Sequence, residues 1–121
     1  MYLVGKPHPN RDLLASFLRE NPHETYVTSA EVYQEIIHRY VAIARTEVIA
    51  DAFEMLDALV DAIYSVSEED VREAHRICLA RARLSGRDCL HVAVMRNHAV
   101  PRVLSCDQGF EFVSEIERLP R

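Results

Sequence analysis

The sequence predicts an α/β fold in which a short parallel sheet lies between layers of helices. Short runs rich in β-branched and aromatic residues, typical of buried strands, alternate with longer runs whose apolar residues recur every three or four positions. Strands separated by whole helices cannot pair as hairpins, so crossover connections must join them into a parallel sheet. Because 49% of the 121 residues are apolar, enough for a hydrophobic core, we expect one domain over residues 1–121.

The first half of the chain contains two predicted helices and one predicted strand. A helix is expected over residues 11–20, where apolar side chains recur at helical spacing after a proline-rich break. Residues 24–28 are rich in β-branched and aromatic side chains, which predicts a buried strand. Thr28 or Ser29 can then cap a second helix over residues 30–45.

The second half continues the alternation. An amphipathic helix over residues 47–60 precedes a strand candidate over residues 62–66. Ser67 and the acidic residues after it provide the start of a helix that continues to about Arg83, because negative charge in the first turn is favourable to the helix dipole. Three further elements are predicted: a helix over 87–97, a strand over 102–105 and an edge strand over 116–119.

The net charge and the counts of cysteine and histidine limit the classes of function that this protein can have. The formal net charge of −5 argues against broad phosphate neutralisation, but it does not exclude a nuclease, because a metal site needs carboxylates. The three cysteines are widely spaced and odd in number, which suits a reducing compartment. The six histidines form no zinc-binding pattern, so we expect structural or surface roles for them. With no secretory leader and no apolar run of roughly 20 residues, a cytoplasmic protein without membrane contact is expected.

Three acids stand out by their positions. Asp107 lies two residues past the strand that ends at Ser105, and Asp88 lies in the first turn of the helix before that strand, so both could face the crevice at the carboxyl ends of the strands. Glu35 lies beside the apolar stripe of the helix over residues 30–45, where a carboxylate needs a partner or a metal. Each acid also has an ordinary explanation: a helix-dipole acid for Asp88, a turn former for Asp107 and a solvated helix face for Glu35.

Three segments carry a resemblance to a known family. Residues 27–40 resemble the second strand and the acid-bearing helix of PIN domains, the fold of VapC-like toxins. Residues 84–94 are similar to the helix that carries the family's third acid. Residues 103–110 resemble the family's hydrophobic strand, which is followed by Ser or Thr, any residue, Asp and then Phe. The three segments occur in the family's order and cover nearly the whole chain.

The resemblance implies a metal-dependent endoribonuclease that hydrolyses RNA phosphodiester bonds, as the toxin of a type II toxin–antitoxin pair. Glu35, Asp88 and Asp107 would hold Mg²⁺ or Mn²⁺, since these hard cations prefer oxygen ligands and generate a nucleophile from water. Ser105 would position a carboxylate or a water, and Arg87 would contact a phosphate. An antitoxin protein would then be the partner, laying a helix or an extended tail over the cleft.

The chain departs from the family at its first residues. PIN domains normally begin with a central strand that carries an Asp followed by Thr or Ser and Asn, whereas residues 1–9 resemble the segment after that strand. We therefore expect the first central strand and the first metal-binding Asp to be missing, which would leave an apolar slot flanked by unpaired backbone groups. A start codon assigned too far downstream, or a shortened chain, would account for this. These residues alone should bind metal weakly and have little activity.

A second hypothesis is a catalytically silent PIN-like module for protein binding or oligomerisation. The DNA upstream of Met1 distinguishes the two: an in-frame β-branched run ending in Asp-Thr-Asn supports the enzyme, and a stop codon supports the silent module. A receiver-like or nucleotide-binding domain is disfavoured because the sequence lacks a Gly-rich phosphate loop. We also expect a homodimer, because the helix over residues 47–60 carries more apolar surface than one small sheet covers.

Overall fold

The computed structural model describes residues 1–4, 11–81, 83–105, 110, 113 and 115–119. Its five strands form one sheet in the order β3-β2-β1-β4-β5, and every neighbouring pair is parallel. This is the sheet that the alternation of strands and helices predicted. The strands are β1 (Tyr2–Leu3), β2 (Val27–Ser29), β3 (Ala62–Tyr64), β4 (Arg102–Leu104) and β5 (Glu117–Leu119).

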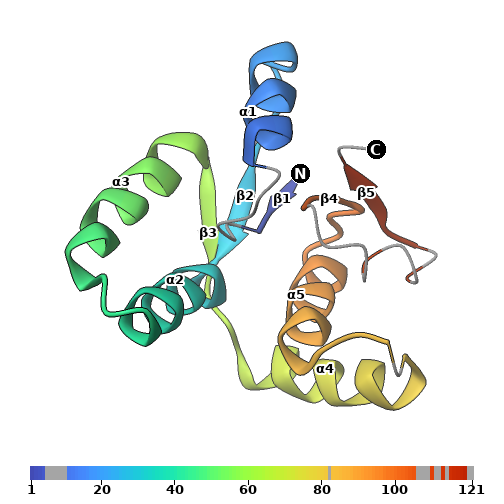
Figure 1. Ribbon diagram of the computed structural model, residues 1–121. Coiled ribbons are helices and arrows are strands. Elements are labelled where there is room, and N and C mark those ends of the chain that lie inside the picture. The colour runs from blue at the N-terminus through green and yellow to red at the C-terminus, as the bar shows by residue number, and fades with distance from the viewer. Residues whose placement is uncertain (5–10, 82, 106–109, 111–112, 114, 120–121) are drawn as a thin grey trace.

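Helices connect β1 to β2, β2 to β3 and β3 to β4 and flank the sheet, as expected for the predicted α/β class. Figure 1 shows α2 and α3 as one pair beside β3, and α4 and α5 as another pair near β4. No helix within the described ranges is long and apolar enough to cross a membrane. The helices are α1 (Arg11–Glu20), α2 (Ala30–Ala42), the short 3-10 helix η1 (Thr46–Val48), α3 (Ile49–Leu59), α4 (Glu68–Ala80) and α5 (Gly86–Asn97).

The expectation of a missing central strand is wrong. Tyr2 pairs with Val27 of β2 on one side and with Val103 of β4 on the other, so β1 occupies the centre of the sheet. Figure 1 accordingly places the N-terminus in the middle of the strands. The Thr28 hydroxyl also donates a hydrogen bond of 2.9 Å to the Leu3 carbonyl oxygen. Two apolar residues are enough to fill the slot, because their neighbours on both sides supply the hydrogen bonds that a central strand needs.

Several element boundaries differ from the predicted ones. The second helix was expected to reach Arg45 but ends at Ala42, and Ala44 has a φ of 58°, a left-handed conformation that a helix cannot continue through. The helix expected over residues 47–60 begins as η1 and becomes α3 only at Ile49. The α4 helix ends at Ala80, earlier than predicted. The edge position predicted for the last strand is confirmed by β5.

The start of α4 is fixed by a capping box. The Asp70 backbone N–H donates to the Ser67 hydroxyl at 3.1 Å, and the Ser67 N–H donates to the Asp70 carboxylate at 2.9 Å. Asn97 of α5 donates a further hydrogen bond of 2.6 Å to the other Asp70 oxygen. Burial alone would raise the pKa of Asp70, but these hydrogen bonds outweigh it and hold the pKa below its usual value. The carboxylate therefore ties the beginning of α4 to the end of α5.

Candidate active site

Helix α2 carries Glu35 into the interior. The helix begins directly after β2, and its buried face is formed by Val32, Glu35 and Ile36. Only 6% of Glu35 is exposed, so its carboxylate does not belong to a solvated helix face. The sequence left that explanation open, and the burial excludes it. An ionised carboxylate at this depth needs hydrogen bonds or a cation to offset the loss of water.

Helix α5 carries Asp88 and His91 into the interior, where His91 contacts Glu35. The Ser85 hydroxyl caps the helix by accepting a hydrogen bond of 3.2 Å from the Asp88 backbone N–H. Asp88 is 4% exposed and His91 is fully buried one turn later. The helix is interior, and its other buried residues are Cys89, Val92, Ala93, Val94 and Met95. A dipole interaction alone does not require an acid to be buried, so the ordinary explanation of Asp88 is incomplete.

A chain of hydrogen bonds links four buried side chains from four elements. The Ser29 and Tyr2 hydroxyl oxygens lie 2.8 Å apart, and the Tyr2 oxygen lies 2.6 Å from His91 Nδ1. On the other side of the ring, His91 Nε2 lies 2.7 Å from Glu35 Oε1. Burial raises the pKa of Tyr2, so its hydroxyl keeps its proton. The chain joins Glu35 of α2 to the helix that carries Asp88.

A polar cavity of about 160 Å³ opens beside Glu35. It is lined by Glu31, Gln34, Glu35 and His38 of α2 and by Arg87 of α5. Arg87, which directly precedes Asp88, therefore shares a cavity with Glu35. The combination of carboxylates with a guanidinium suits a ligand that carries negative charge and a cation at once, as a metal-bound phosphate does.

The remaining predicted site residues are placed as follows. Ser105 is buried immediately after β4, where its backbone N–H donates a hydrogen bond of 2.8 Å to the Leu119 carbonyl oxygen of β5. Asp107 lies outside the described residues. In the part of the chain that the structure describes, no three His, Cys, Asp or Glu side chains form a group that could hold a metal ion. The two carboxylates of Glu35 and Asp88 are thus the described portion of the predicted metal site.

Sequence comparison identifies the family. The family model of the PIN domain matches residues 1–116. This chain belongs to the PIN-domain family. A VapC ribonuclease of Mycobacterium bovis and ribonuclease VapC13 of Mycobacterium tuberculosis are each 45% identical to it over 123 aligned positions, covering 98% of this chain and 92% of each relative. Ribonuclease VapC23 of Mycobacterium tuberculosis is 33% identical over 109 positions, covering 88% of this chain and 86% of the relative.

Two solved structures share the fold of this PIN domain. The crystal structure of Mycobacterium tuberculosis VapC20, described as a sarcin-ricin loop cleaving toxin, superposes with a TM-score of 0.77 at 16% identity and 98% coverage of both chains. The VapBC2 structure from Rickettsia felis, bound to a DNA fragment from its promoter, has a TM-score of 0.72 at 12% identity and covers 98% of this chain and 96% of that one. At these identities the likeness concerns the fold alone.

The donor set of this PIN domain fits a hard divalent cation. Glu35 and Asp88 would supply oxygen ligands from two elements, and Mg²⁺ is commonly held by one or two carboxylates together with waters and phosphate. The first strand adds no acid, because residues 1–4 are Met, Tyr, Leu and Val. The predicted lack of a first-strand acid therefore holds for the described β1, although the strand itself is present.

Sequence reasoning missed three members of the hydrogen-bonded chain. Ser29 was considered only as a helix cap, but its side chain makes no capping hydrogen bond and contacts Tyr2 instead. Tyr2 lies in a segment where the sequence predicts no strand, and the sequence predicts for His91 only a structural or surface role or a place at the border of the cleft, one turn beyond Asp88. One signal was available: a histidine within an apolar helix, one turn after an acid, needs polar partners for both ring nitrogens.

Proposed function

We propose that this PIN domain is a metal-dependent endoribonuclease and the toxin of a type II toxin–antitoxin pair. The observation that carries the proposal is the burial of two carboxylates, Glu35 and Asp88, on helices that the His91 contact brings together. Burying such groups is unfavourable for a purely structural core, which favours a functional reason for keeping them. Relatives that are 45% identical over nearly the whole chain are named ribonucleases, which supports RNA as the substrate.

The proposed roles follow from residue chemistry. Glu35 and Asp88, together with Asp107 from the segment after β4, would hold Mg²⁺ or Mn²⁺. When bound, the cation lowers the pKa of water and stabilises the charge that develops on the phosphate and the leaving oxygen. Arg87 lines the cavity beside Glu35, where its guanidinium can donate two hydrogen bonds to phosphate oxygens. The Ser105 hydroxyl would orient a neighbouring carboxylate or water at the end of β4.

An RNA-cleavage assay tests the enzyme proposal. Purified protein is incubated with single-stranded RNA oligonucleotides of mixed sequence that carry a fluorophore and a quencher, with Mn²⁺, with Mg²⁺ or with EDTA. We expect cleavage that requires the cation and exceeds the rate of the Asp88→Asn variant. The rate should be low, because β1 provides no carboxylate ligand.

The same assay can be extended with a variant of Arg87 and with an added antitoxin. Arg87→Gln should raise KM by about 10- to 150-fold, since a charge-assisted hydrogen bond contributes roughly 1.5–3 kcal/mol, whereas Arg72→Gln on the exposed face of α4 should not. A cognate antitoxin added to the assay should suppress cleavage.

Cleavage that is identical in wild type and Asp88→Asn, or that survives EDTA, would contradict the enzyme proposal. Absence of cleavage from a protein that still binds Mn²⁺ would favour the silent binding module instead.

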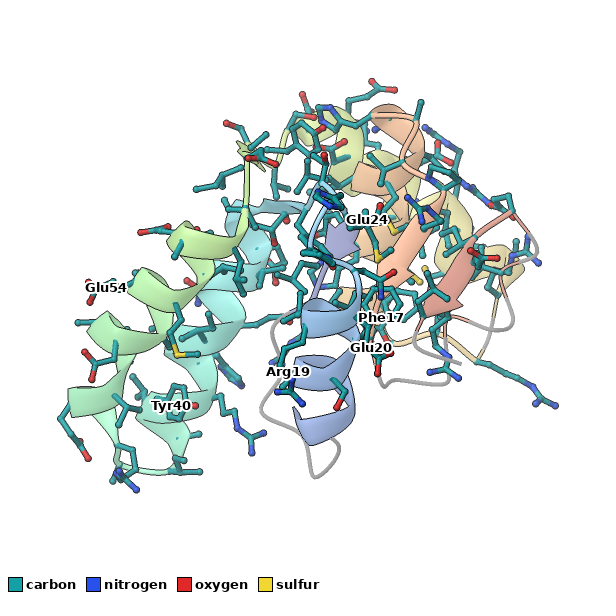
Figure 2. The ribbon with its side chains drawn as sticks, turned by 90° about the horizontal axis from the view of Figure 1, so that it is seen from above. Phe17, Arg19, Glu20, Glu24, Tyr40 and Glu54 are labelled. Carbon is teal, nitrogen blue, oxygen red and sulfur yellow. The ribbon has the colours of Figure 1, made fainter. Side chains whose placement is uncertain are left out.

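A homodimer through α2 and α3 is also proposed. The two helices lie side by side, with Tyr40 labelled on α2 and Glu54 on α3 in Figure 2. Leu56 is buried and the Phe53 ring packs edge-on against Tyr33, with 5.0 Å between ring centroids. Met55 remains 69% exposed, and other exposed apolar residues of this pair and the segment after α2 are Ile37, Val41, Ile43 and Leu59. A second copy would remove this surface from water.

Sedimentation velocity at micromolar concentration tests the dimer. The wild type should sediment as a dimer and Met55→Glu as a monomer, because a charge at the interface would lose its water on association. Leu79→Glu is the matched control, since Leu79 is an exposed apolar residue on α4, and this variant should remain a dimer. A wild-type monomer throughout the concentration range would contradict the proposal.

A further inference from the structure

His91 is a fully buried polar side chain to which the chemistry above gives no role. Its ring lies between Tyr2 and Glu35, with hydrogen bonds of 2.6 Å and 2.7 Å at its two nitrogens. The Tyr2 ring packs beside it, with ring centroids 5.4 Å apart. Polar side chains in a core are normally hydrogen-bonded, but two directional contacts on opposite sides of one ring also fix its orientation.

The direction of the hydrogen bonds can be derived from the chemistry of the groups. An ionised carboxylate only accepts, so His91 Nε2 donates to Glu35 Oε1. In the neutral ring, Nδ1 then accepts from the Tyr2 hydroxyl, which in turn accepts from Ser29. In this arrangement the Ser29 hydroxyl, the Tyr2 hydroxyl and the His91 Nε2–H each donate one hydrogen bond along the chain. The Glu35 carboxylate of α2 therefore sets the tautomer of His91, and Tyr2 of β1 and Ser29 of β2 complete the hydrogen bonds that hold the ring.

We propose that His91 is a positioning residue that orients the Glu35 carboxylate for a divalent cation, with Tyr2 and Ser29 holding the ring. The inference rests on the proposed function. A carboxylate on a flexible side chain must be ordered before it can bind a cation, and a fixed hydrogen bond to one oxygen does this in advance. The contact spans 56 positions in the sequence, so it also aligns α2 with the helix that carries Asp88.

Two substitutions separate positioning from simple packing. In His91→Gln, the amide nitrogen can reach the place of Nε2 and donate to Glu35. In His91→Asn, the shorter side chain can reach only the place of Nδ1 and contact Tyr2. Both variants lose the aromatic ring, so both lose similar packing, and only one of them keeps the hydrogen bond to Glu35.

The measurement is the Kd for Mn²⁺, obtained by isothermal titration calorimetry at a temperature where circular dichroism shows every variant folded. We expect His91→Asn to bind Mn²⁺ about 10–100-fold more weakly than wild type, the range typical of lost outer-shell partners. His91→Gln should stay close to the wild-type affinity. The inference is overturned when the two variants lose affinity equally, or in proportion to their thermal midpoints. A wild-type protein that binds no Mn²⁺ would refute the proposed function itself, and this inference with it.

Tyr2→Phe provides a second test of the positioning contacts, because it removes only one hydroxyl group. The substitution keeps the ring that packs beside His91 and removes the hydroxyl that anchors Nδ1. A loss of Mn²⁺ affinity smaller than that of His91→Asn, with Glu35 and Asp88 intact, supports the chain of positioning contacts. Wild-type affinity in a folded Tyr2→Phe protein would overturn the part assigned to Tyr2 and Ser29.

Discussion

Replacement of Asp88 by Asn is expected to weaken Mn²⁺ binding by at least about 100-fold, more than the loss of an outer-shell partner does, and to reduce RNA cleavage to background. The substitution preserves the shape of the side chain but replaces a charged oxygen ligand with a neutral amide. The Ser85 cap should survive, because it uses the Asp88 backbone N–H and not the carboxylate. Calorimetric titration of Mn²⁺ into both proteins measures the effect directly.

A matched control distinguishes a metal ligand from a helix-dipole acid. Asp51 occupies the third position of α3, as Asp88 does in α5, but Asp51 is exposed. Loss of a dipole interaction alone changes stability by about 0.3–1 kcal/mol at either site. Asp51→Asn should therefore leave Mn²⁺ binding and RNA cleavage at wild-type values. Equal behaviour of the two variants would remove Asp88 from the proposed metal site.

Replacement of Ile77 by Ala is expected to lower the free energy of unfolding by about 2–5 kcal/mol. Ile77 is 2% exposed on the buried face of α4, the helix that packs most extensively against another element, α5. The cavity left by the deleted methyl and methylene groups would loosen that contact. Because α5 carries Asp88 and His91, the variant should also bind Mn²⁺ more weakly. Urea unfolding followed by circular dichroism measures the change in stability.

Leu79→Ala is the control for the packing prediction. Leu79 lies two residues from Ile77 on the same helix but is 75% exposed, so its truncation should alter stability by no more than about 0.5 kcal/mol. Similar losses in the two variants would contradict the assignment of Ile77 to the α4–α5 contact. An Ile77→Ala protein that is as stable as the wild type but binds Mn²⁺ more weakly would also contradict this assignment of Ile77.

The helices of this PIN domain could be predicted from local pattern, whereas the central strand could not. The repeat of apolar residues located α1, α2 and α5 to within a few positions, because a helix shows its buried face every three to four residues. A strand of two residues, Tyr2–Leu3, has no such period. Its place at the centre of the sheet depends on pairing with Val27 and Val103, which are distant in sequence.

For the candidate site too, some features follow from the sequence and others only from the tertiary structure. The sequence by itself determined the family of the protein and the order of the three acids along the chain, and it predicted that these acids bind metal, because these inferences depend on residue type and spacing. Only the tertiary structure decided that Glu35 is buried and that His91 lies between it and Tyr2, 89 positions away in sequence. The physical reason is that periodicity specifies which face of each helix is apolar, whereas the packing of distant elements decides which faces meet. The metal-binding roles of Glu35, Asp88 and Asp107 all stay predictions.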